Sequence, residues 1–281
     1  MTAASMHSSI PAVVLSRASE IPDAVAVVSG GIATTYGELA DQVARVGRAM
    51  LAAGVCRGDR VAIWAPNSHR WILTALGAQS VGAAIVPINT RYKTDEAAFP
   101  LARTGARVLV ASAGFMGIDP SAAATTATRH TGQSVRVIDV NDGDQAESGG
   151  GSWGDFLHGG DDVEPDQWTV EVDAVAADDL SDVMFTSGST GKPKGVRHLH
   201  GPTIRQTFNT IAENGIVATD RYLIVNPFFH VFGYTGGWVP GLFSGCTVYP
   251  LPTFDVDQVL DMVEQESITY FPGPPTIFHS I

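Results

Sequence analysis

Short apolar runs alternate with helix-forming segments along most of this 281-residue chain, and this alternation constrains the fold more than any other feature. Runs suited to buried strands lie at 60–65, 84–87, 107–111 and 135–140, and residues 71–81 between the first two have a helical pattern. Strands that are connected through helices lie parallel in one sheet. The pattern therefore predicts an α/β fold with mostly parallel β-sheets covered by helices.

One helix start can be located from its capping residues. Thr35 and Glu38 have the spacing of a capping box, in which each side chain accepts from the other residue's backbone N–H. Apolar residues then recur at steps of four and three, which places them on one helical face: Leu39, Val43, Val46, Met50 and Ala53. Gly54 is suited to end this helix in a left-handed turn.

The second half of the chain has a similar alternation. Further strands are expected at 182–185, 195–199, 221–225 and 268–271. Residues 255–266 predict an amphipathic helix whose apolar side carries Val256, Val259, Leu260 and Val263. Residues 141–179 interrupt the pattern with glycine clusters and many acidic residues. We interpret 141–179 as a solvated surface excursion within one region spanning 1–281, and not as a domain.

Composition excludes several classes of function. Lys and Arg number 17 against 29 Asp and Glu, so the net charge is -12, which argues against nucleic acid or an anionic membrane as a partner. No apolar run reaches membrane-spanning length, and no basic and apolar leader precedes the first helix, so a cytoplasmic location is expected. Cys56 and Cys246 form no metal-binding cluster and are predicted to be buried thiols.

The segment FTSGSTGKPKGV at 185–196 concentrates hydroxyl groups, glycines and lysines after a short apolar strand. Glycines allow backbone N–H groups to approach an anion closely, and hydroxyls and lysines add donors and charge. A triphosphate suits such a loop. The segment is not a Walker A loop, because Pro193 stands where that motif needs Ser or Thr. An unrelated P-loop NTPase is therefore disfavoured.

The same twelve residues resemble the signature of the adenylate-forming superfamily, which includes acyl- and aryl-CoA synthetases, luciferases and peptide-synthetase adenylation domains. Other blocks resemble the family too: TTYGEL at 34–39, GDRVAIWAPNS at 58–68, VGAAIVPINTRY at 81–92 and FPGPPTIF at 271–278. The resemblance implies ATP-dependent activation of a carboxylic acid as acyl-AMP and transfer to coenzyme A, with Mg²⁺ present. It implies that the ATP phosphates are held by Thr186, Ser187, Gly188, Ser189, Thr190, Gly191 and Lys194.

A second candidate site lies in NPFFHVFGYTGG at 226–237. No Asp, Glu, Lys or Arg occurs from Tyr222 to Phe254, and an uncharged aromatic cleft suits the apolar body of an acid. A buried core segment would have the same composition. The block PFFH resembles the family's acyl-adenylate region, which implies an acyl-substrate pocket formed by Phe228, Phe229, His230 and Phe232. An α-amino acid is disfavoured because its ammonium group would find no acidic partner here.

The sequence departs from the family pattern at its end. Full-length relatives continue well beyond Ile281 with the adenine motif, the ribose aspartate and a C-terminal domain that carries the catalytic lysine, so no catalytic residue and no metal ligand is assigned here. The resemblance implies an acyl-CoA synthetase fragment. An aryl- or amino-acid adenylation domain that loads a carrier protein, and a nucleotide-binding module without turnover, stay open. Exposed sheet edges are compatible with a homodimer or a C-terminal partner. The identity of the acid is open.

Overall fold

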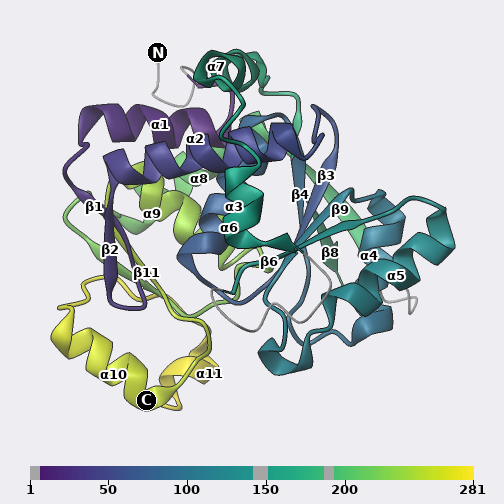
Figure 1. Cartoon of the computed structure of the whole chain (residues 1–281). Helices are drawn as coiled ribbons and strands as arrows, with labels where there is room; N and C mark the ends of the chain where they lie inside the picture. The colour runs from purple at the N-terminus through teal and green to yellow at the C-terminus, as the bar shows by residue number, and fades with distance from the viewer. Residues whose placement is uncertain (1–6, 142–150, 187–192) are drawn as a thin grey trace.

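The computed structural model describes residues 7–141, 151–186 and 193–281. Two β-sheets share a central layer of helices (Figure 1). The larger sheet has seven strands in the order β7-β6-β5-β3-β4-β8-β9, and all neighbouring strands are parallel except the antiparallel pair β8–β9. Its strands are β3 (Arg60–Trp64), β4 (Ala84–Pro87), β5 (Val108–Ala111), β6 (Arg136–Asp139), β7 (Gly151–Ser152), β8 (Leu180–Thr186) and β9 (Lys194–Leu199).

The smaller sheet joins the two ends of the chain. Its order is β10-β11-β1-β2, with β1 parallel to β11 in the register Val27↔Val248 and antiparallel to β2. The strands are β1 (Val25–Ser29), β2 (Ile32–Thr35), β10 (Arg221–Ile224) and β11 (Thr247–Pro250). The first strand of the chain therefore completes its pairing only with residues near the other end.

The helices form layers on both faces of each sheet. The central layer contains α1 (Ile10–Glu20), α2 (Tyr36–Ala52), α3 (His69–Ser80) and α9 (Val239–Ser244). Helices α4 (Thr94–Thr104) and α5 (Pro120–Thr131) cover the outer face of the larger sheet, and α10 (Val256–Gln265) and α11 (Pro275–Phe278) lie against the smaller sheet. The remaining elements are α6 (Trp153–His158), α7 (Pro165–Ala174), α8 (His200–Asn214), η2 (Phe115–Gly117) and η3 (Tyr234–Trp238).

Strand periodicity explains how each sheet supplies two cores. In β3, Val61 and Ile63 face the central layer, while Ala62 and Trp64 face α4 and α5. Successive strand side chains point to opposite faces, so a strand that is covered on both faces must be apolar throughout. This accounts for the continuous apolar runs in the sequence. It also confirms the α/β fold with a mostly parallel sheet.

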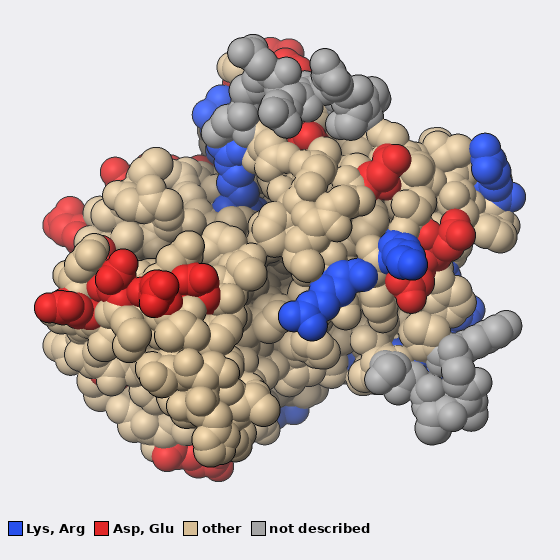
Figure 2. Space-filling model, turned by 90° about the horizontal axis from the view of Figure 1, so that it is seen from below, with Lys and Arg blue, Asp and Glu red and all other residues tan. Residues whose placement is uncertain are grey.

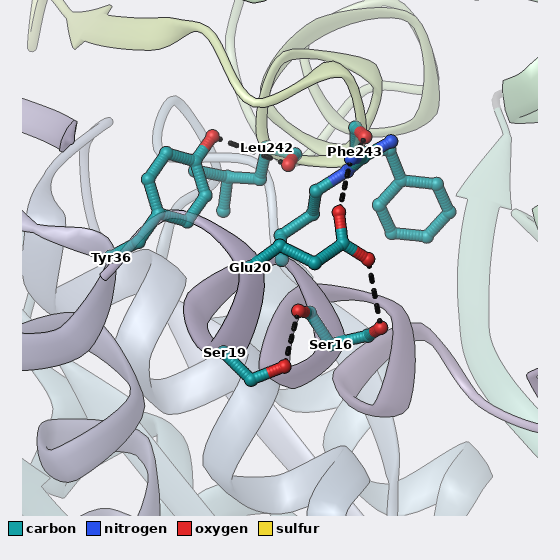
Figure 3. Close-up of polar contacts among 7 residues, drawn as sticks. Ser16, Ser19, Glu20, Tyr36, Leu242 and Phe243 are labelled. Carbon is teal, nitrogen blue, oxygen red and sulfur yellow. Dashed lines mark hydrogen bonds and ion pairs between the residues drawn. The ribbon is translucent and has the colours of Figure 1, made fainter. Parts of the chain in front are cut away.

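Contacts between the first and last helices of the central layer fasten the two ends of the chain together. Tyr36 at the start of α2 donates its hydroxyl to the carbonyl of Leu242 in α9 at 3.2 Å (Figure 3). Arg17 of α1 donates from Nε to the carbonyl of Phe243 at 2.8 Å, and Glu20 accepts from Arg17 and from the Ser16 hydroxyl. The bonds that Arg17 and Tyr36 donate hold α1 and α2 against α9.

Local predictions are confirmed at the start and end of α2. The capping box between Thr35 and Glu38 is present, and Gly54 has a φ of 77° just beyond the helix. The structure corrects three other predictions. Residues 268–271 form only one bridge, between Tyr222 and Tyr270, and not a strand. Cys56 is exposed, while Cys246 is buried.

The third correction concerns the solvated excursion predicted at 141–179, of which 142–150 lie outside the described residues and 151–179 are largely helical. Trp153 and Phe156 of α6 are buried in the central core. The turn after α6 approaches α2 closely, because a Cβ on Gly160 would lie 2.5 Å from the backbone nitrogen of Ala49. Most of α7 is exposed, but Trp168 donates to the Ser80 hydroxyl at 2.9 Å. The segment is thus a packed helical cover with an acidic outer side.

Candidate functional site

A cleft of about 330 Å³ lies where carboxyl ends of strands from both sheets meet. Many of its lining residues lie within four residues of the carboxyl ends of β3, β4, β10 and β11, namely Pro66, Asn67, Thr90, Arg91, Asn226, Pro227, Thr253 and Phe254. Ligands of open α/β sheets bind at this edge, outside the carboxyl ends of the strands. A larger hollow of about 590 Å³ lies beside the first residues of β6 and the outside of α5, so no carboxyl strand end opens into it.

Two asparagines fix the backbone at the floor of this cleft. Asn67 is buried, and its Nδ2 donates to the carbonyl of Asn226 at 2.9 Å while its Oδ1 accepts from the backbone N–H of Phe228 at 2.8 Å. The side chain of Asn226 in turn donates to the carbonyl of Pro272 at 3.1 Å. One carboxamide after β3 therefore holds the chain after β10, which sets the two sheets relative to each other at the cleft.

The cleft walls combine apolar area with a single charged side chain. Phe115, Phe229 and Phe254 line it together with Pro66, Pro227, Pro252 and Pro274. Arg91 is the one ionisable group among the described lining residues, and its turn is held by its backbone N–H donating to Asn89 Oδ1 at 2.9 Å. Such a site suits an anion attached to an apolar body, and it offers no acidic partner to an ammonium group.

Charge on the surrounding surface is uneven. Seen from below, acidic side chains gather on the left-hand lobe, whereas across a crease in the surface basic side chains lie beside further acidic ones (Figure 2). An anionic ligand would therefore meet less repulsion on the mixed side of the crease than on the acidic left-hand lobe.

The structure separates the four predicted acyl-pocket residues. Phe228 is fully buried and packs edge-on against Trp71 with ring centroids 5.3 Å apart, so its ring belongs to the central core. Phe229 lines the cleft, and the exposed His230 ring lies 5.0 Å from it. Phe232 is 43% exposed. The acyl contacts of Phe229, His230 and Phe232 stay predictions, whereas the position of Phe228 favours the core interpretation.

The first and last residues of the predicted phosphate loop are brought together by the β8–β9 hairpin. Thr186 pairs with Lys194, and the Thr186 hydroxyl donates to the Lys194 carbonyl at 3.5 Å. Because β8 runs parallel to β4, Thr186 lies at the carboxyl edge of the sheet, the edge that also carries the cleft. The other candidates, Ser187, Gly188, Ser189, Thr190 and Gly191, lie outside the described residues. The phosphate-binding roles stay predictions.

A buried acidic group lies behind this hairpin. Asp182 of β8 is fully buried, and its carboxylate contacts His198 Nδ1 at 2.5 Å and accepts from the Ser181 hydroxyl at 2.8 Å. The hydrogen bond to Asp182 raises the pKa of His198 above its usual value, against the opposing effect of burial. The pair is formed by cross-strand neighbours, so it fastens the base of the hairpin and does not face the cleft.

Metal binding finds no support among the described residues. No group of three or more His, Cys, Asp or Glu side chains that could hold a metal ion occurs in 7–141, 151–186 and 193–281.

A family model described as AMP-binding enzyme matches residues 15–281. The chain belongs to this family. Among similar curated proteins, a 3-[(3aS,4S,7aS)-7a-methyl-1,5-dioxo-octahydro-1H-inden-4-yl]propanoyl:CoA ligase of Rhodococcus jostii (strain RHA1) is 40% identical over 96% of this chain and 53% of that protein. A feruloyl-CoA synthase of Amycolatopsis sp is 36% identical over 94% of this chain and 48% of that protein. The chain thus spans about half the length of these relatives.

Solved structures agree with this membership. The inhibitor-bound N-terminal domain of FACL13 from Mycobacterium tuberculosis matches with a TM-score of 0.75 at 26% identity, over 98% of this chain and 65% of that chain. In this AMP-binding family member, no helix within the described ranges is long and apolar enough to cross a membrane.

Sequence reasoning missed Asn67, Asn226 and Arg91 as site residues. Each lies within four residues of the carboxyl end of a strand, in a polar turn after an apolar run. Strand-end polar residues were therefore an available signal, because the carboxyl ends of parallel strands share one edge.

Proposed function

We propose that this chain is the ATP- and acid-binding part of an AMP-forming acid–CoA ligase. The observation that carries the proposal is the shared edge of the sheet, at which the hairpin of Thr186 and Lys194 and the cleft of Phe229 and Arg91 both open. Its relatives at 36–40% identity are acyl-CoA ligases and synthetases. A site that holds a triphosphate beside an apolar acid has the arrangement required by acyl-adenylate formation.

In the proposed reaction, a carboxylate oxygen of the acid attacks the α-phosphorus of ATP, and the bond to pyrophosphate breaks. Negative charge builds on the departing pyrophosphate, which the Lys194 ammonium and the Thr186 hydroxyl would stabilise from the ends of the hairpin. The sulfur of coenzyme A then attacks the acyl carbon, the bond between that carbon and the phosphate oxygen breaks, AMP leaves, and the thiol proton passes to solvent. Mg²⁺, when bound with ATP, would neutralise phosphate charge.

The proposed acid is apolar and carries a ring. The names of two relatives describe ring-bearing acyl groups, an octahydroindenyl propanoyl group and a feruloyl group. The flat faces of Phe229 and Phe254 and the proline-rich walls provide apolar area for such a ring. Arg91 provides a counter-charge to an anion, and the described walls contain no acid that could pair an ammonium group.

Calorimetric titration of the 281-residue chain with ATP tests the nucleotide half of the proposal. We expect Lys194→Ala to weaken ATP binding by about tenfold or more, because a charge-assisted contact to phosphate is lost. Arg103→Ala, which removes an exposed charge from α4, is the matched control and should leave the affinity unchanged. Absence of ATP binding by the parent chain, or equal affinity in Lys194→Ala, would contradict the proposal.

Paired stable analogues of an acyl-adenylate test the acid half. We expect the phenylpropanoyl sulfamoyl adenosine to bind at least about 100-fold more tightly than the phenylalanyl analogue, because the second carries an ammonium group with no partner. Equal or tighter binding of the phenylalanyl analogue would favour the alternative, an amino-acid adenylation domain that loads a carrier protein. An assay of acid-dependent pyrophosphate exchange then tests whether the chain turns over substrate or is a nucleotide-binding module without turnover.

A further inference from the structure

Gln79 is a fully buried polar side chain that the proposed chemistry does not use. It lies in the last turn of α3, where all residues from Trp71 to Ser80 are buried. Its Nε2 donates to the carbonyl of Ser181 at 3.0 Å and to the hydroxyl of Tyr234 at 2.8 Å. A backbone carbonyl can only accept, so the NH₂ end of the carboxamide must face Ser181. One NH₂ group thus bridges two elements that are more than fifty residues apart in sequence.

The first of these elements is the phosphate-loop hairpin, defined as β8 and β9. Ser181 immediately precedes Asp182, the residue through which β8 pairs with Ile85 of β4. The Gln79 bond therefore lies at the point where the hairpin joins the parallel sheet. About five residues of extended strand separate this point from Thr186, or roughly 16 Å, so Gln79 cannot touch a ligand of the loop and can act only by setting the hairpin's position.

The second element is the acyl-side segment, defined as residues 226–238. Tyr234 is fully buried, and its ring packs against Trp71 and Trp238 with centroids 6.1 and 5.3 Å away. Its backbone N–H donates to the carbonyl of His230 at 3.0 Å, which connects it by one turn to the residues beside the cleft. The other end of the segment is held by Asn67 at the cleft floor.

We propose that Gln79 is a positioning residue that couples the phosphate-loop hairpin to the acyl-side segment through its shared NH₂ group. This inference rests on the proposed function for the identity of the two ligands. Loss of the amide leaves the Ser181 carbonyl and the Tyr234 hydroxyl without that donor in a buried site, and each element gains freedom relative to the other. The nucleotide side and the acid side of the site are then no longer set by one common contact.

Hydrogen–deuterium exchange on the 281-residue chain tests the coupling without any ligand. We expect Gln79→Met to raise exchange about tenfold in residues 180–186 and in residues 234–238, because both hydrogen bonds are lost while the side-chain volume is kept. Tyr234→Phe should raise exchange in 234–238 and leave 180–186 within about twofold. The matched control is Ser80→Ala, which removes the partner of Trp168 from the same turn of α3 and should change neither segment.

ATP titration of the same variants measures whether the loss of Gln79 also changes the affinity for ATP. We expect Gln79→Met to weaken ATP binding about fivefold, Ser80→Ala to leave it unchanged, and the double variant with Tyr234→Phe to bind no more weakly than Gln79→Met alone. For Gln79→Met, unchanged exchange in residues 180–186 or in residues 234–238 overturns the coupling. Raised exchange with unchanged ATP affinity overturns its role in ligand binding. A parent chain that does not bind ATP overturns the proposed function instead, and the exchange result still decides whether the coupling exists.

Discussion

Helices α3 and α10 are of similar length and both begin with a capped N-terminus, but they differ in burial. All residues of α3 from Trp71 to Ser80 are buried, because both sheets and α2 surround it. In α10 only Val259 is buried, while Leu260 and Val263 are 46% and 38% exposed. The comparison shows that burial is decided by the layers on each side of a helix. We therefore expect global stability to be concentrated around α3, and α10 to respond locally.

The largest expected effect comes from a side chain that packs on α3. Phe228→Ala should lower the free energy of unfolding by about 3–5 kcal/mol, because it removes a fully buried ring from contact with Trp71 and Trp238. Urea denaturation measures this. Phe232→Ala, in the same segment but 43% exposed, should change the free energy by less than about 1 kcal/mol. Similar losses in the two variants would break the proposed concentration of stability around α3.

The second effect is a pH dependence from the same core. His200 is fully buried, and its Nδ1 accepts from the backbone N–H of Ile10, so burial lowers its pKa to about 4. The unfolded state therefore binds more protons between about pH 6.5 and pH 4, and stability falls as the pH falls through this window. We expect His200 to account for about 2 kcal/mol of the loss between pH 7.5 and pH 5.

His200→Asn tests this value, since the amide oxygen can keep the acceptor while the titration is removed. His69, whose pKa burial also lowers to about 4, remains in the variant and keeps its share of the pH dependence. Urea midpoints at pH 7.5 and pH 5 should differ less in His200→Asn than in the parent chain. Equal differences would show that His200 does not contribute.

Removing the N-terminal caps of α3 and α10 should have a smaller effect on stability, and it compares the two helices directly. The Ser68 hydroxyl accepts from the backbone N–H of Trp71 at 3.2 Å, and Asp255 Oδ1 accepts from that of Gln258 at 2.9 Å. Ser68→Ala should lower the free energy of global unfolding by about 1 kcal/mol. Asp255→Ala should raise hydrogen exchange in residues 256–265 and leave the global value nearly unchanged. If Asp255→Ala lowered the free energy of global unfolding as much as Ser68→Ala, α10 would unfold together with the rest of the protein.

The smallest effect is expected on the exposed side of α10. Leu260→Lys should change the free energy of unfolding by no more than about 0.5 kcal/mol, because the side chain is already 46% exposed. Val259→Lys, one residue earlier and fully buried, is the opposite case and should be strongly destabilising. A large loss in Leu260→Lys would show that this face is covered in solution.

The sequence located those elements whose signals are local. The runs that became β3, β4 and β8 are bounded by turn residues, and the capping box of Thr35 and Glu38 depends only on neighbours. Residues 268–271 have the composition of a strand, but a strand needs a partner, and one bridge to Tyr222 is all that the described residues provide. Residues 151–179 contain two helices that were not predicted, because acidic residues and glycines dominate the composition of this region. Trp153 and Phe156, three residues apart, nevertheless indicated a buried helical face.

The candidate site was only partly predictable for the same physical reason. Composition identified an uncharged aromatic segment. It could not distinguish Phe228 in the core from Phe229 in the cleft, because these adjacent residues are chemically identical and differ only in where their side chains point. The role of Asn67 depends on Asn226 and Phe228, which lie about 160 residues away. The role of Gln79 could not be predicted from the sequence, because its two hydrogen-bond partners lie 102 and 155 residues away.

The pairing of β1 with β11 means that β1 cannot complete its sheet until most of the chain has been synthesised. Val27 leaves the ribosome about 220 residues before its partner Val248, a delay of about 10–40 s at ordinary translation rates. During this interval, the edge of β1 that pairs with β11 and the part of α1 that packs on α9 have no native partner to cover them. The β8–β9 hairpin, in contrast, can close as soon as its own residues emerge, because its two strands are close in sequence. Nascent chains stalled before residue 247 should therefore recruit chaperones through their first 50 residues.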